Sequence, residues 1–130
     1  MQKRILVVED SREWQKFHKT MLDESIEGEY YLRIASCARE GMEILEAEEP
    51  FGLIFSDLQM ETEFLPELAG EWFVKNAKQS EKTQKTKIVL VSATYNIGFI
   101  AAKLGVDYLS KRTVINFPDS YISMVKSVFS

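Results

Sequence analysis

Cysteine is nearly absent from the sequence, and long apolar runs are missing altogether. Cys37 is the only cysteine, so no intramolecular disulfide and no cluster of thiolate metal ligands can form. A reducing cytoplasm is the expected compartment. The apolar run from Ile5 to Val8 is too short for a signal peptide or a membrane span. We therefore expect a soluble cytoplasmic protein that does not bind a membrane.

The sequence also lacks an excess of positive charge. It carries 20 acidic and 16 basic residues, for a formal net charge of −4. Proteins that bind nucleic acids need a basic surface to displace the counterions of the phosphates, so direct binding to nucleic acid is not expected. No repeat, low-complexity segment or linker interrupts the chain, and we expect one domain over residues 1–130.

Short apolar runs alternate with segments of helical spacing. The runs predict strands at residues 4–9, 30–35, 52–56, 87–91 and 106–109. Helices are predicted after caps at Ser11 and Ser36, over residues 70–79 and 97–104, and from Pro118 onward. Five such strand–helix units predict an α/β fold: a doubly wound parallel sheet of five strands, with helices on both faces.

Polar residues follow the predicted strands and would meet at one edge of the sheet, where ligands bind in this architecture. They are three carboxylates, two hydroxyls and an ammonium: Glu9, Asp10, Asp57, Ser92, Thr94 and Lys111. Clustered carboxylates repel one another, and Mg²⁺ relieves this because it prefers oxygen ligands. Such a metal would bridge phosphoryl oxygens, and a carboxylate is a competent phosphoryl acceptor. This pattern indicates an aspartyl-phosphate site.

Five motifs carry a resemblance to a known family. They are ILVVED, CAREGMEIL, GLIFSDLQM around Asp57, VLVSAT around Ser92 and GVDYLSK ending at Lys111. In this order the chain resembles a bacterial response-regulator receiver domain along nearly its whole length. The resemblance implies a flavodoxin-like sheet with strand order 2-1-3-4-5, and a phosphorylated switch rather than an enzyme.

The resemblance also implies a role for each site residue. Asp57 is expected to accept the phosphoryl group. Mg²⁺ is expected to bind Asp10, Asp57 and the main-chain carbonyl of Gln59, with Glu9 acting through water. Ser92 and Lys111 are expected to contact the phosphoryl oxygens, Tyr108 to act with Ser92 as the switch, and Gln59 and Thr94 to tune dephosphorylation.

The same resemblance implies partners. A histidine kinase or phosphotransfer protein would donate the phosphoryl group. The face made by the fourth helix, fifth strand and fifth helix would bind a downstream protein, or a second copy in a weak homodimer. Because we expect no effector domain after residue 130, the output is expected to be protein binding.

Two departures from the family pattern stand out. Arg112 follows the lysine where the family usually has proline, so we expect a trans peptide bond there. The loop Glu61–Ala69 is longer than usual, and Gly70 takes the place of a nearby family glycine. These departures leave open a second hypothesis, an interaction module that works without phosphorylation. A third, an aspartate-dependent phosphatase, is disfavoured because Gln59 stands where such enzymes place a general acid.

Overall fold

The computed structural model describes residues 2–60 and 69–129. The strands are β1 (Arg4–Val8), β2 (Tyr31–Ala35), β3 (Leu53–Asp57), β4 (Lys87–Ser92) and β5 (Asp107–Ser110). The helices are α1 (Arg12–Ser25), α2 (Ala38–Ala47), α3 (Ala69–Gln79), α4 (Ile97–Leu104), α5 (Lys111–Asn116) and α6 (Asp119–Phe129). A short 3₁₀ turn, η1 (Glu81–Thr83), precedes β4.

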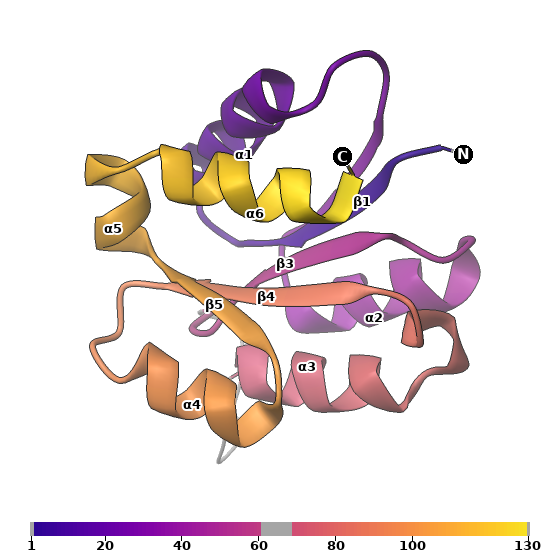
Figure 1. Ribbon diagram of the computed structural model, residues 1–130. Coiled ribbons are helices and arrows are strands. Elements are labelled where there is room, and N and C mark those ends of the chain that lie inside the picture. The colour runs from indigo at the N-terminus through magenta and orange to yellow at the C-terminus, as the bar shows by residue number, and fades with distance from the viewer. Residues whose placement is uncertain (1, 61–68, 130) are drawn as a thin grey trace.

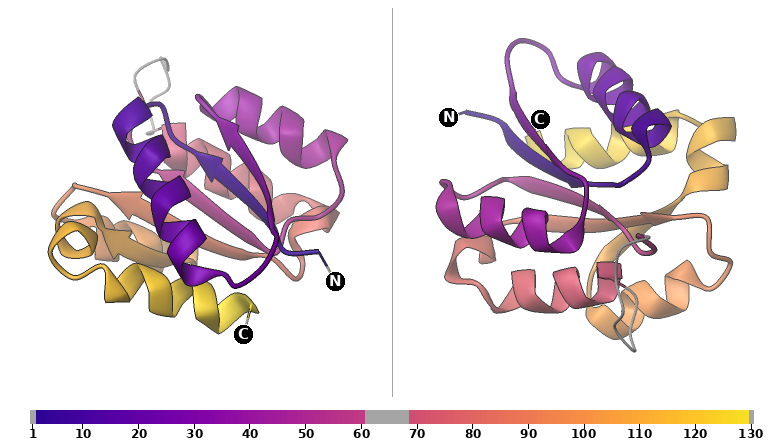
Figure 2. Two further views of the ribbon diagram at one scale, coloured as in Figure 1. Left: turned by 90° about the horizontal axis from the view of Figure 1, so that it is seen from above. Right: turned by 180° about the vertical axis from the view of Figure 1, so that it is seen from behind.

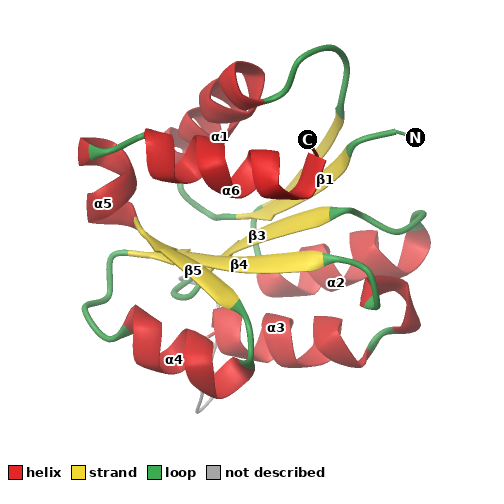
Figure 3. Ribbon diagram, viewed as in Figure 1, coloured by secondary structure: helices red, strands yellow, loops and turns green. Residues whose placement is uncertain are grey.

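The strands form one parallel sheet in the order β2-β1-β3-β4-β5. Figure 1 shows α1 and α6 on one face of this sheet and α2, α3 and α4 on the other. The same three layers are clear when helices and strands are coloured separately (Figure 3). The predicted fold class and the strand order are therefore confirmed.

Each face of the sheet buries its own apolar core, because side chains alternate between the faces of a strand. Leu6 and Ile54 belong to the cluster beneath α2, α3 and α4. Ile5 and Phe55 belong to the cluster beneath α1 and α6. Burial on both faces explains why the central strands read as continuous apolar runs.

Two local predictions were wrong. Cys37, not Ser36, is the N-cap of α2, and its side chain makes no capping hydrogen bond. Ser36 instead donates its backbone N–H to a carboxylate oxygen of Glu40, at 2.6 Å. The second error is that α5 was not predicted. Its sequence KRTVIN contains three consecutive β-branched residues, which have modest helix propensity, and only Val114 is buried.

The remaining helix boundaries agree closely with the sequence. Ser11 caps α1 by accepting the backbone N–H of Trp14 at 3.3 Å. Gly105 ends α4 with a φ of 72°, a left-handed conformation that glycine adopts without strain. The segment 61–68 of the predicted long loop lies outside the described residues, and Ala69 already begins α3. No helix in the described ranges has the length and apolar character of a membrane span.

Candidate functional site

Three carboxylates meet at the carboxyl edge of the sheet. Glu9 and Asp10 directly follow β1, and Asp57 is the last residue of β3. Each can place one oxygen so that all three lie within 4.8 Å of one another. The three carboxylates lie close together because β1 and β3 are hydrogen-bonded neighbours in the parallel sheet, with Val8 opposite Ser56.

Asp57 is held firmly by its surroundings. Only 7% of the residue is exposed. Its Oδ1 accepts the backbone N–H groups of Leu58 at 2.7 Å and Gln59 at 3.4 Å. Gly70, in the first turn of α3, donates its N–H to the Leu58 carbonyl at 2.9 Å. The Asp57 carboxylate is therefore fixed by the backbone that follows β3.

Gly70 approaches this backbone so closely that no larger residue fits. A Cβ atom at position 70 would lie 2.1 Å from the carbonyl oxygen of Asp57 and 2.5 Å from the Cα of Leu58. Glycine is the residue that permits such an approach. The structure thus supplies a physical reason for the glycine that the sequence motif placed here.

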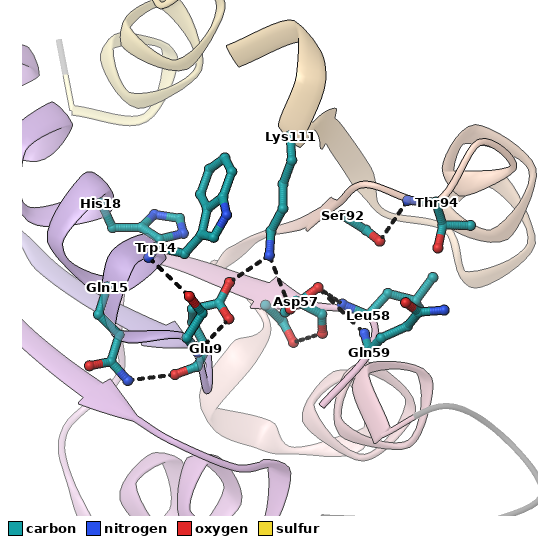
Figure 4. Close-up of polar contacts among 12 residues, drawn as sticks. Glu9, Trp14, Gln15, His18, Asp57, Leu58, Gln59, Ser92, Thr94 and Lys111 are labelled. Carbon is teal, nitrogen blue, oxygen red and sulfur yellow. Dashed lines mark hydrogen bonds and ion pairs between the residues drawn. The ribbon is translucent and has the colours of Figure 1, made fainter. Parts of the chain in front are cut away.

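Lys111 reaches the carboxylates from the start of α5. Its Nζ lies 3.0 Å from Glu9 Oε1 and 3.2 Å from Asp57 Oδ2 (Figure 4). The same ammonium lies 4.7 Å from the centre of the Trp14 ring, within the range of a cation–π contact. Trp14 is not among the residues that the sequence predicted at the site. The sequence feature that could have indicated this contact is the position of Trp14, one turn after the Ser11 cap and near the site.

Glu9 is the most perturbed acid of the site. Its Oε2 accepts the Ser11 N–H at 2.9 Å, and its backbone carbonyl accepts Gln15 Nε2 at 2.7 Å. Burial, followed by the charge of Asp57, raises the pKa of Glu9 to about 7. Although Oε1 faces Lys111, it receives no aligned hydrogen bond from the described residues. A buried carboxylate oxygen that lacks an aligned hydrogen bond can bind a further cation.

An oxygen-rich set of this kind fits Mg²⁺, which takes carboxylate and carbonyl oxygens and keeps several waters. Carboxylate oxygens come from Glu9, Asp10 and Asp57. Gln59 is exposed and lies two residues after Asp57, the last residue of β3, so its main-chain carbonyl is a candidate ligand. The residues present therefore fit the metal that the sequence pattern indicated.

Ser92 ends β4 beside this cluster and is almost fully buried. Its Oγ accepts the backbone N–H of Thr94 at 3.2 Å, which leaves the hydroxyl hydrogen free to donate (Figure 4). The N-cap of α4 is Asn96. Ser92 therefore does not cap α4.

Tyr108 and Arg112 lie on the outer side of the site. Tyr108, on β5, is 47% exposed, and its hydroxyl end lies against Gly98 of α4. The peptide bond between Lys111 and Arg112 is trans, as predicted. Arg112 is exposed and helical within α5, so the lysine sits at a helix start rather than in an extended loop.

His18 lies deeper, between α1 and α6. Its Nδ1 and the Tyr121 hydroxyl share a hydrogen bond of 2.7 Å, and its ring packs against Phe55. Burial, with a smaller effect from the Lys111 charge, lowers the pKa of His18 to about 3. The structure buries this histidine almost completely. Tyr121 could not be found as its partner because it lies 103 residues away.

Comparisons with known proteins place this geometry in a known fold. No family model and no curated protein matches the sequence. The Vibrio cholerae chemotaxis protein CheY4 superposes with a TM-score of 0.77 at 19% identity, covering 98% of this chain and 99% of that one.

Two further structures give the same result. A CheY-like receiver domain protein from Methanospirillum hungatei has a TM-score of 0.66 at 22% identity, covering 98% of both chains. The Mn²⁺-bound form of response regulator Rcp1 has a TM-score of 0.73 at 22% identity, covering 97% of this chain and 91% of that one. Together with the strand order, these likenesses show that the chain has the CheY-like receiver fold.

Proposed function

We propose that this protein is a phosphorylatable receiver that accepts a phosphoryl group on Asp57. The observation that carries the proposal is the position of Lys111, whose ammonium lies within 3.2 Å of both Asp57 and Glu9 at the carboxyl edge of the sheet. The site thus combines an acceptor carboxylate with a fixed cation and two further acids. The receiver fold of the similar structures supports the same role.

The proposed donor is the phosphohistidine of a histidine kinase or phosphotransfer protein. A carboxylate oxygen of Asp57 forms the new P–O bond while the P–N bond to the donor imidazole breaks. The bonding pair stays on the imidazole nitrogen, which takes up a proton. Lys111 neutralises charge on the phosphoryl oxygens, and the Ser92 hydroxyl donates a hydrogen bond to one of them.

Mg²⁺ is the proposed cofactor, bound by Asp10, Asp57 and the Gln59 carbonyl, with Glu9 acting through water. When bound, it neutralises charge on the acids and on the phosphoryl oxygens. One similar structure is a Mn²⁺-bound form, and this supports a divalent cation at the acidic cluster here. Gln59 and Thr94 flank the path of a hydrolytic water and are proposed to set the lifetime of the phosphorylated state.

The proposed output is a change at the face made by α4, β5, α5 and α6. Five large apolar side chains are exposed there or next to it: Tyr95, Phe99, Tyr108, Ile115 and Phe117. Movement of Ser92 toward the phosphoryl group and inward rotation of Tyr108 would alter this surface. The protein then acts by binding a downstream cytoplasmic protein or, weakly, a second copy. It performs no turnover beyond slow self-dephosphorylation.

Beryllofluoride, which mimics the phosphoryl group, tests the proposal in the presence of Mg²⁺. We expect calorimetric binding to wild type, with amide NMR shifts at Ser92, Thr94 and Tyr108. The matched control is Asp57→Asn, which keeps the shape of the acceptor and removes its nucleophilic charge, and we expect no binding to it. Equal binding to both proteins, or none to either, would contradict the proposal.

A second candidate function is an interaction module that does not need phosphorylation. It is favoured by the exposed apolar side chains, among them Phe99 at 73% exposure, because they are accessible to a protein in the described conformation. Full partner binding and cellular function of Asp57→Ala would support this alternative. Loss of both with intact folding would count against it.

A further inference from the structure

A groove between α1 and the outer strand β2 takes no part in the site described above. Its volume is about 710 Å³. Arg12, Lys16 and Lys19 line it from α1, and residues of β2 line it from the sheet. In Figure 2, α1 is the indigo-purple helix that packs on one face of the sheet.

The groove is basic although the whole chain is acidic. Its lining includes four basic residues and no acidic residue, against a net charge of −4 for the protein. Lys19 and Arg33 already have carboxylate partners. None of the ion pairs between described residues involves Arg12 or Lys16. These two residues are exposed, stand four apart on one helical face, and are available to an acidic partner.

The backbone of β2 is open along the same groove. Within the described chain its only neighbouring strand is β1. The Tyr31 N–H and the Ala35 carbonyl bond inward, at 2.8 and 2.9 Å, to backbone atoms flanking β1. Because these groups alternate along a strand, the N–H and C=O groups of Leu32 and Ile34 point outward. The edge therefore offers donors and acceptors at the spacing of a further strand.

The floor of the groove is apolar. The side chains of Leu32 and Ile34 are half-buried and pack against the core beneath α1. An extended chain lying beside β2 would cover this apolar surface and pair with the outward backbone groups. Its alternate side chains on the α1 side would face Arg12 and Lys16, where carboxylates would be stabilised.

We propose that the groove between α1 and β2 binds an extended acidic segment of a partner protein, which adds to the sheet as a strand beside β2. Strand addition of this kind takes affinity from backbone hydrogen bonds and specificity from alternate side chains. The binding does not depend on Asp57. Charged residues at a sheet edge can also serve only to prevent pairing between copies of the chain, and that role predicts no binding.

The probe is a short fluorescein-labelled peptide in which glutamate alternates with valine and threonine, followed by fluorescence anisotropy at low salt. We expect saturable binding to wild type, with the largest amide NMR shifts at Leu32 and Ile34. The double variant R12E/K16E should raise the Kd by about tenfold or more. The control K85E/K126E makes the same charge change at exposed residues away from the groove and should change Kd by less than about twofold.

Three results would overturn the proposal. The first is no binding of the peptide by folded wild type. The second is equal weakening by both double variants, which would mean that overall charge and not the groove attracts the peptide. The third is tighter binding to phosphatidylglycerol vesicles or single-stranded DNA than to the peptide, which would assign the groove to another kind of anion. Asp57→Asn should bind the peptide like wild type, which separates this test from that of the proposed function.

Discussion

Among single residues, Lys111 is the cation that lies against two acids of the site. Its ammonium lies 3.0 Å from Glu9 and 3.2 Å from Asp57, and the Trp14 ring covers its other side. The lysine therefore occupies the region of negative potential that a divalent cation also seeks. We therefore predict that Lys111 would compete with a bound divalent cation for the same negative charge.

Replacement of Lys111 by methionine should strengthen Mg²⁺ binding and weaken phosphorylation. Methionine keeps an unbranched apolar side chain over Trp14 but removes the charge, so we expect Mg²⁺ affinity to rise by about tenfold. Beryllofluoride affinity should fall, since one phosphoryl contact is lost. Isothermal titration measures both quantities.

The matched control for this prediction is Arg112→Gln. It removes the same charge from the adjacent residue, which is exposed, so Mg²⁺ affinity should change by less than about twofold. Weaker Mg²⁺ binding by Lys111→Met, or an equal rise of Mg²⁺ affinity in both variants, would show that Lys111 does not compete with the metal.

At the scale of elements, α3 and β3 are joined where the site is built. Gly70 lies against the Asp57–Leu58 backbone, and its N–H bonds to the Leu58 carbonyl. The start of α3 thus positions Asp57 without contributing a side chain. A contrasting contact, between Gly98 and Tyr108, involves only the end of a side chain that can move.

Gly70→Ala should destabilise the protein by about 2 kcal/mol or more, because its Cβ would meet backbone atoms that cannot move independently. The free energy of unfolding in urea measures this cost. The remaining folded protein should bind beryllofluoride more weakly, since Asp57 must shift. Gly98→Ala is the control and should change the free energy by less than about 1 kcal/mol. If the two variants were equally stable, the close approach of α3 would have no energetic consequence.

At the scale of the whole molecule, the pair His18–Tyr121 connects α1 to α6 beneath the site. His18 is the only histidine in the chain, so its titration can be isolated. Its pKa is about 3 in the folded protein, against an ordinary value of 6.5. The unfolded chain therefore takes up this proton first, and stability is lost as pH falls from about 6.5 toward 3.

The titration of Glu9 changes the stability of the protein in the opposite direction. Its pKa is raised from 4.5 to about 7 by folding, so its contribution to stability is lost as pH rises between these values. A comparison of wild type with a variant that lacks only the histidine pair cancels this effect, because Glu9 is present in both proteins.

The double variant H18L/Y121F should lose less stability on acidification than wild type. Replacing both partners avoids leaving a buried hydroxyl unpaired. Between pH 7 and pH 5, wild type should lose about 2 kcal/mol more than the double variant. Urea unfolding at the two pH values measures the difference. Equal losses of unfolding free energy in the two proteins would mean that His18 becomes protonated in the folded state.

Local patterns in the sequence were sufficient to predict the order of the strands and of most helices. The apolar runs located all five strands to within one or two residues, and the parallel topology then required Glu9, Asp10 and Asp57 to share one edge. The helix α5 was not predicted because its residues have weak intrinsic preference for a helix. It forms where β5 ends and Val114 can be buried.

By itself, then, the sequence determined the α/β architecture and the polar residues at the strand ends, since both follow from short-range periodicity and from the geometry of parallel sheets. Only the tertiary structure decided that Trp14 covers Lys111 and that His18 pairs with Tyr121. It also decided that Gly70 touches the backbone of Asp57 and that a basic groove runs beside β2. These contacts join residues far apart in the chain. They depend on how helices pack on the sheet, and no local pattern encodes that packing.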